Sequence, residues 1–148
     1  LPTFFTNHTY YWGDTHAANL GRDRADFISP MRAAIDRGIL PTNHSDCPVT
    51  AVDPLFTVWS AVNRVSRSGA VIGAAQRITP YEALQAITAN AARQYFEEER
   101  KGTLAEGKLA DLVVLDGNPL KVRAADIKGL AVLATYKEGR EVYSRSAA

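Results

Sequence analysis

The spacing of apolar and polar positions along this 148-residue chain changes once, near residue 101. Before that point, short apolar runs alternate with stripes of helical spacing; after it, short apolar runs are separated by turn residues. The pattern therefore predicts β-α-β-α-α followed by strands only. In chain order the predicted elements are strand 3–6, an irregular polar stretch 21–26, helix 31–37, strand 39–40, helix 54–67, a helix from 80 to the charged run 97–101, and strands 112–115, 130–137 and 140–143. Glu138 and Gly139, between the last two strands, predict a tight hairpin.

Two of the predicted helices carry clear start signals. Thr79 and Glu82 form the signature of a capping box, and Asp53 stands before a proline as the cap of the helix that starts at residue 54. Arg64 and Arg67 fall off the apolar stripe of that helix, so we expect them to face solvent; Arg64 could also act there as a structural tie. The stripe itself consists of Leu55, Val58, Trp59, Val62 and Val65.

The loop at the end of the second predicted strand, residues 43–49, holds His44, Asp46 and Cys47. In α/β proteins the carboxyl ends of strands are where chemical groups are usually placed. On an extended strand, His44 and Asp46 would share one face, because side chains alternate between faces. We interpret Cys47 as a small buried apolar residue, since no Cys-His-Asn arrangement accompanies it.

A second polar and aromatic segment, residues 8–16, follows the first predicted strand and contains two histidines, one aspartate and three aromatic residues. We interpret it as a long loop that forms a pocket wall. His8 and Trp12 are its candidates for substrate contact, with ordinary packing or hydrogen bonding as the alternative, and His16 is expected at the surface. The three histidines and the aspartate of loop 43–49 match no compact zinc-ligand spacing, so a self-contained zinc site is not predicted.

Composition narrows the classes of function. A hydrophobic content of 46% and a charged content of 22% are typical of a soluble globular protein, and a net charge of +1 predicts neither nucleic acid nor a membrane surface as partner. The single cysteine excludes an intrachain disulfide and fits a reducing, cytoplasmic location. No apolar run approaches the roughly 20 residues of a membrane span. The chain starts at Leu1 without an initiator methionine, so we expect it to be part of a longer protein.

Residues 102–116 read Gly-Thr-Leu-Ala-Glu-Gly-Lys-Leu-Ala-Asp-Leu-Val-Val-Leu-Asp and strongly resemble a signature of the amidohydrolase superfamily. Segments 8–14, 45–49 and 59–64 resemble motifs of its YtcJ-like branch, amidohydrolase family 3. The resemblance covers essentially the whole chain and implies an α/β fold. Residues 1–101 would be the C-terminal portion of a (β/α)8 metal-hydrolase barrel, its last two strand-helix units. Residues 102–148 would be a segment of a small composite β-sandwich.

The resemblance also implies a function: a fragment of a metal-dependent hydrolase that cleaves the C–N bond of an amide, N-acyl or N-formyl group in a small molecule. Asp46 stands where the family places an aspartate at the end of the eighth strand. Such an aspartate binds the divalent metal, Zn or a similar ion, and relays a proton from the attacking water to the leaving nitrogen. His8, Trp12 and His44 are the candidate substrate-binding residues.

Two alternatives accompany this reading. The family's other metal ligands have no counterpart in this chain, so the chain as given could be an inactive structural piece. Its strands would then have open edges, and we expect it to associate with itself or with a companion N-terminal segment. Alternatively, the parent protein could be a ring-amine deaminase, because related barrels use a similar aspartate.

Overall fold

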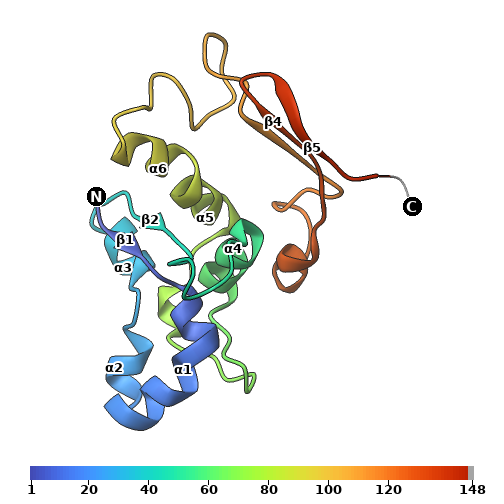
Figure 1. The fold of residues 1–148 in the computed structure, drawn as a ribbon. Coiled ribbons are helices and arrows are strands. Elements are labelled where there is room, and N and C mark those ends of the chain that lie inside the picture. Colours follow the sequence, from blue (N-terminus) through green and yellow to red (C-terminus); the bar gives the residue numbers. More distant parts are fainter. Residues whose placement is uncertain (147–148) are drawn as a thin grey trace.

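The computed structural model describes residues 1–146 and shows a helical part and a separate three-stranded sheet (Figure 1). Strands β1 (Thr3–Phe4) and β2 (Thr42–Asn43) pair in parallel, and three helices connect them: α1 (Asn7–Leu20), α2 (Arg22–Asp26) and α3 (Met31–Ile35). The next elements are α4 (Pro54–Asn63), the 3-10 helix η1 (Ala74–Gln76), α5 (Pro80–Ile87) and α6 (Ala89–Gln94). The chain ends in β3 (Leu112–Leu115), the 3-10 helix η2 (Ala124–Gly129), β4 (Val132–Lys137) and β5 (Arg140–Ser144).

Helices α1 and α2 were not predicted. Residues 8–16, expected as a loop, lie within α1, and residues 22–26, expected to be irregular, form α2. Tyr, Trp, Thr, Asp and Gly are modest or poor helix formers, so local propensity did not indicate a helix. Tertiary packing accounts for α1, because Gly13 lets the segment after α4 approach closely. A Cβ at Gly13 would lie 2.7 Å from Cγ1 of Ile72.

The predicted strand 39–40 is also wrong. Ile39 and Leu40 are exposed, and the pairing with β1 lies further along, at Thr42 and Asn43. Only two residues of each strand form the ladder. Short strands of this kind carry little periodic signal, so their register depends on the neighbouring strand.

The predicted helix 54–67 ends early, at Asn63, because Arg64 adopts the left-handed conformation (φ 50°, ψ 47°). The helix predicted from residue 80 is divided at Thr88 (φ −126°, ψ −88°) into α5 and α6. Its last turn stops at Gln94, before the charged run 97–101. That run forms turns, within which Lys101 pairs with Glu97.

Helix α4 forms the centre of the hydrophobic core. Its predicted cap is confirmed, since the Asp53 carboxylate accepts a hydrogen bond from the Phe56 amide at 2.9 Å. Trp59 is buried, as its position on the apolar stripe predicted, and its Nε1 donates to the Ala125 carbonyl at 3.1 Å. Ile127, also in η2, packs in the same core, so η2 links the sheet to the helices. The buried core residues are Met31, Val58, Trp59, Ala61, Val62, Ile78, Ala83, Ala86 and Ile127.

Arg64 does not face solvent as predicted: its side chain is fully buried, whereas Arg67 is exposed. The Arg64 guanidinium donates to the carbonyl oxygens of Ile72 (2.7 Å), Ser29 (3.1 Å) and Ile28 (2.6 Å). Burial lowers the pKa of Arg64 to about 10, so it stays charged at neutral pH. Arg64 therefore ties the segment after α4 to the segment before α3, in agreement with its interpretation as a structural tie.

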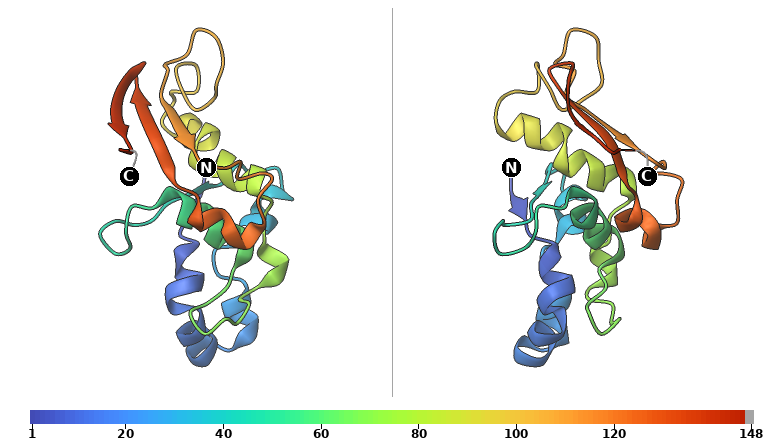
Figure 2. Two further views of the ribbon diagram at one scale, coloured as in Figure 1. Left: turned by 90° about the vertical axis from the view of Figure 1, so that its right-hand side faces the viewer. Right: turned by 45° about the vertical axis from the view of Figure 1, so that its right-hand side comes forward.

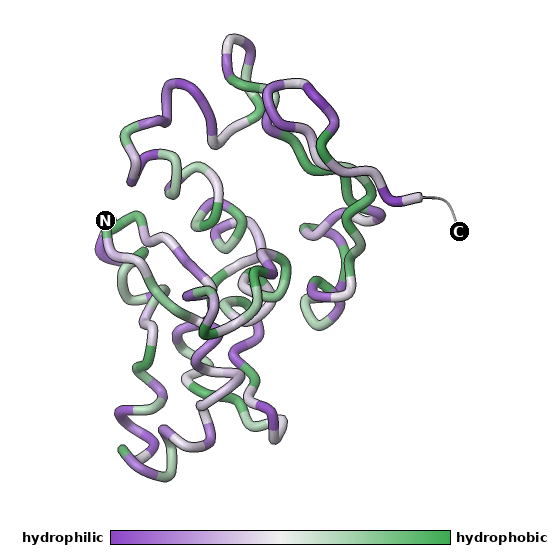
Figure 3. The backbone as a smooth tube through the Cα atoms, viewed as in Figure 1, coloured by the Kyte–Doolittle hydropathy of each residue, from purple (hydrophilic) through white to green (hydrophobic). Residues whose placement is uncertain are grey.

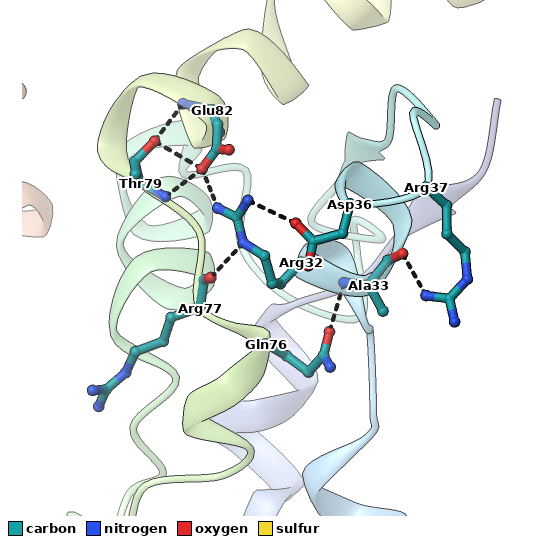
Figure 4. Close-up of polar contacts among 8 residues, drawn as sticks. All are labelled: Arg32, Ala33, Asp36, Arg37, Gln76, Arg77, Thr79 and Glu82. Carbon is teal, nitrogen blue, oxygen red and sulfur yellow. Dashed lines mark hydrogen bonds and ion pairs between the residues drawn. The ribbon is translucent and has the colours of Figure 1, made fainter.

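A second polar network joins α3 to the start of α5 (Figure 4). The capping box is confirmed: the Thr79 hydroxyl accepts from the Glu82 amide at 3.2 Å, and the Glu82 carboxylate accepts from the Thr79 amide at 2.8 Å. Arg32 pairs with the same carboxylate and with Asp36 at 3.3 Å. Burial alone would raise the pKa of Glu82, but the hydrogen bonds from Arg32 and Thr79 outweigh it and hold the pKa below 4.5.

Strands β3, β4 and β5 form an antiparallel sheet that stands away from the helices (Figures 1 and 2). The predicted hairpin is present: Glu138 and Gly139 both have positive φ (52° and 77°), as a tight two-residue turn requires. The sheet exposes Val113, Val114 and Val142, and Figure 3 shows hydrophobic stretches along it. Within residues 1–146, the outer edges of β3 and β5 have no strand partner, and no helix has the length and apolar character needed to cross a membrane.

Candidate functional site

One face of α1 carries a row of aromatic and imidazole rings. His8, Trp12 and His16 are spaced by four residues and therefore lie above one another along the helix. The His8 ring centroid is 5.0 Å from Trp12 and 5.4 Å from His16, and the two imidazoles are stacked. The first turn of the helix, with His8, lies directly after β1, so the row starts at the end of that strand.

Asp46 lies in the loop that follows β2. It is exposed and has a positive φ of 52°. The Asp46 amide donates to Nδ1 of His44 at 3.1 Å, and the Asp46 carbonyl accepts from the Val49 amide at 2.7 Å. The prediction that His44 and Asp46 share a strand face is wrong, because β2 ends at Asn43 and the backbone turns before Asp46.

Cys47 is exposed, not buried as expected. It lies in the turn between Asp46 and Val49, where the side chains point away from the core and Val49 is exposed as well. A cavity of about 240 Å³ lies beside His44, with Val52 and Ile87 among its apolar lining residues.

Phe5 joins the two segments of the site. Its ring centroid lies 4.4 Å from that of His8 and 5.2 Å from that of His44, so the ends of β1 and β2 bring these imidazoles to the same edge. Burial lowers the pKa of His8 below 6.5, and His16 lowers it further, whereas the Asp46 carboxylate raises it. His8 is therefore neutral at pH 7, with one ring nitrogen free to accept and the other able to donate.

His16 was expected at the surface, but it belongs to this cluster. It stacks on His8 with an interplanar angle of 19°. Its Nε2 is buried and has no hydrogen-bond partner among residues 1–146. The spacing of His8, Trp12 and His16 by four residues was the signal that could have placed it there, had the segment been read as a helix.

Tyr10 and Tyr11 point to another side of α1. Tyr10 packs edge-on against Phe56 and Trp59, with centroids 5.1 and 5.6 Å apart. Arg67 lies over the Tyr11 ring at 4.8 Å. These contacts are ordinary packing of α1 on α4, so Trp12 is the aromatic residue of segment 8–16 that lies beside His8.

The described residues do not form a complete metal site. Within residues 1–146, no group of three or more His, Cys, Asp or Glu side chains is arranged to hold a metal ion. A zinc ion in a protein takes three or four protein ligands. The exposed Asp46 carboxylate fits the role of one such ligand, and any further ligands would have to come from other segments.

The sequence profile of the Amidohydrolase family matches residues 2–143. The chain is 34% identical to YtcJ of Bacillus subtilis over 130 residues (86% of this chain, 25% of that protein). It is 30% identical to the N-substituted formamide deformylase of Arthrobacter pascens over 136 residues (91% of this chain, 25% of that protein). The chain thus spans about a quarter of the length of these relatives.

Solved structures show the same fold. An uncharacterized metal-dependent hydrolase from Pyrococcus horikoshii superposes with a TM-score of 0.69 at 24% identity, over 82% of this chain and 25% of that one. Guanine deaminase from E. coli superposes with a TM-score of 0.59 at 22% identity, over 80% of this chain and 30% of that one. At these identities the likeness concerns the fold alone.

Proposed function

This chain belongs to the Amidohydrolase family, and from that premise we propose that it supplies one wall of the active site of a metal-dependent hydrolase. The substrate would be a small molecule with an amide, N-acyl or N-formyl group, whose C–N bond is cleaved. The observation that carries the proposal is the position of Asp46, exposed in the loop after β2 and close enough to His8 to act on its pKa. The relative named N-substituted formamide deformylase supports the class of bond.

The architecture we propose follows the same lines. Strands β1 and β2 would be the last two strands of a (β/α)8 barrel, within residues 1–101, and β3, β4 and β5 would belong to a composite β-sandwich within residues 102–148. The parallel pairing of β1 with β2 and the unpaired edges of the β3–β5 sheet support this view. A companion segment would supply the missing strands, because open strand edges are templates for pairing.

In this proposal the Asp46 carboxylate would be one ligand of a divalent metal, Zn or a similar ion, and that ion would supply a water molecule acidic enough to react near neutral pH. Asp46 would also accept the proton of the attacking water and pass it to the leaving nitrogen. His8, neutral because burial and His16 lower its pKa, hydrogen-bonds the substrate carbonyl. Trp12 and His44, whose rings both lie near that of Phe5, contact the rest of the substrate.

The test is an assay of the intact protein with N-formyl and N-acyl amines, beside aminated heterocycles that would report ring deamination. Positioned proton transfer contributes about 10²- to 10⁴-fold to rate, so Asp46→Asn should lower kcat by about that factor. Asp126→Asn, an exposed carboxylate in η2, is the matched control and should leave kcat unchanged. Near-normal turnover by Asp46→Asn, or full activity after removal of metal by a chelator, would refute the proposal. Release of ammonia from a heterocycle alone would replace it with the deaminase reading.

A further inference from the structure

A chain of buried polar side chains lies beneath the loop that carries Asp46. It consists of Asn43, Thr6, Ser60, Asn7 and Thr50, which come from β2, the start of α1, α4 and the end of the loop. All five are at most 8% exposed. Buried polar groups that lack a partner are costly, so a connected set of this size constrains the backbone segments that it joins.

The direction of each hydrogen bond in this chain can be worked out from one end. The Thr50 hydroxyl donates to the Ser45 carbonyl, which can only accept, so Thr50 must accept from Nδ2 of Asn7, at 3.1 Å. The Asn7 amide is thereby oriented with its oxygen toward Ser60, whose hydroxyl donates to it at 3.0 Å. With the proton of Ser60 committed, the Thr6 hydroxyl donates to Ser60 at 2.6 Å.

The hydrogen bonds at the Asn43 end of this network have defined directions as well. The Thr6 hydroxyl accepts from Nδ2 of Asn43 at 2.8 Å, and the Thr6 amide donates to Oδ1 of the same side chain at 3.2 Å. Every donor therefore has an acceptor, and the orientation of both amide side chains is determined by the network. The order is Asn43, Thr6, Ser60, Asn7, Thr50 and the Ser45 carbonyl.

This network holds residues 44–50, the Asp46 loop, at both ends. Asn43 precedes the loop and is bound to Thr6, the residue before α1; Thr50 ends the loop and is bound to Asn7, the first residue of α1. His8 follows Asn7 directly. Asp46, in between, is exposed, so its position relative to His8 depends on these anchored ends.

We propose that Asn7 and Thr50 are positioning residues, which lock the Asp46 loop to the first turn of α1 so that the carboxylate stays opposite His8. The catalytic consequence rests on the function proposed above, whereas the structural consequence does not. Because α4 supplies the central link, Ser60, the geometry of the site is coupled to the hydrophobic core and not only to the two strands.

The structural test is hydrogen–deuterium exchange of the intact protein, measured by mass spectrometry on peptides that cover residues 44–50. Thr50→Val keeps the shape of the side chain but leaves Asn7 and Ser45 without their partner. Thr9→Val is the matched control, since Thr9 is also buried and, within residues 1–146, its hydroxyl bonds only to the Thr6 carbonyl at the start of α1. The loss of one or two buried hydrogen bonds raises the equilibrium constant for local opening of the loop by roughly tenfold or more. The exchange rate of residues 44–50 should therefore rise by about that factor in Thr50→Val and stay unchanged in Thr9→Val.

Equal exchange of this loop in both variants would overturn the proposal. If Thr50→Val does not fold, Ser60→Ala interrupts the same chain from α4 and should raise the exchange of residues 44–50 in the same way. Thr50→Ser retains the hydroxyl and should restore the exchange rate of the unaltered protein.

The functional readout uses the same variants. Thr50→Val should lower kcat by about tenfold or more with little change in KM, Thr50→Ser should recover it, and Thr9→Val should leave it unchanged. A looser loop with undiminished kcat would overturn the positioning role. If Asp46→Asn itself retained turnover, the proposed function would fail, while the exchange experiment would still decide whether the network anchors the loop.

Discussion

Arg64→Met is the substitution whose effect the structure defines most sharply. Methionine approximates the aliphatic part of the side chain, but it removes the guanidinium and its donors. The carbonyl oxygens of Ile72, Ser29 and Ile28 would lose those donors, and that of Ser29 would keep the Met31 amide as a donor at 2.8 Å. The substitution therefore separates the polar role of Arg64 from its packing.

The expected magnitude follows from two opposing effects. Hydrogen bonds from a charged donor each contribute about 1.5–3 kcal/mol. Burial of the cation is unfavourable, as the lowering of the Arg64 pKa to about 10 indicates, and removal of the charge relieves that cost. A buried carbonyl left without a donor costs about 1–3 kcal/mol, and because this applies to the Ile72 and Ile28 oxygens while the cost of burying the cation is relieved, we expect a net loss of stability of about 2–4 kcal/mol.

The measurement is the free energy of unfolding from urea titration at pH 7, with Arg67→Met as control. Arg67 is exposed and lies over the rings of Tyr10 and Tyr11, so its loss should cost about 1 kcal/mol or less. If Arg64→Met were no more destabilising than Arg67→Met, the Ile72 and Ile28 carbonyls would find other partners and the argument from burial would be refuted.

Two further substitutions test contacts elsewhere among the helices. In Glu82→Gln the free energy of unfolding should fall less steeply as the pH is lowered. The folded pKa of Glu82 lies below 4.5, so its carboxylate stabilises the fold above the unfolded pKa, and this contribution is lost as pH falls through the folded pKa. Identical slopes of unfolding free energy between pH 5 and pH 3 for both proteins would contradict this role of the Arg32 and Thr79 contacts (Figure 4). Gly73→Ala should cost more than about 2 kcal/mol, because φ is +66° and the new Cβ would lie 1.9 Å from the Asp26 carbonyl oxygen. Gly69→Ala, with φ +88° and open space around it, should cost only about 1 kcal/mol in the same urea titration, and equal costs would show that the Asp26 contact relaxes freely.

The elements that the sequence predicted well are those with local signals. Asp53 caps α4, Thr79 and Glu82 form a capping box, and Glu138 with Gly139 turns the hairpin. Each of these depends on a few neighbouring side chains that satisfy exposed backbone groups or adopt a special backbone conformation. The resemblance to the amidohydrolases was likewise carried by contiguous motifs, and the family match confirms it.

The predictions that were wrong share a different cause: they depended on tertiary contacts. Residues 8–16 of α1 have little helical preference, and the helix is stabilised by its packing, where Gly13 allows the close approach of Ile72. Arg64 looked like a surface cation, because charged residues off an apolar stripe usually face water, but the carbonyl oxygens of Ile28, Ser29 and Ile72 accept hydrogen bonds from its buried guanidinium. Burial was also predicted wrongly for two residues near the site. His16 was expected at the surface and stacks on His8, whereas Cys47 was expected to be buried and is exposed.

For the candidate site, the sequence alone identified Asp46 as the candidate catalytic residue, since it follows a strand and stands in a family motif. Only the tertiary structure decided what lies near it. The backbone turns at Asp46, Phe5 brings His8 and His44 to one edge, and buried side chains from β2, α1 and α4 anchor the loop. Caps and turns depend on neighbouring residues, whereas Thr6 and Ser60 lie 54 positions apart and can form a hydrogen bond only after the chain has folded.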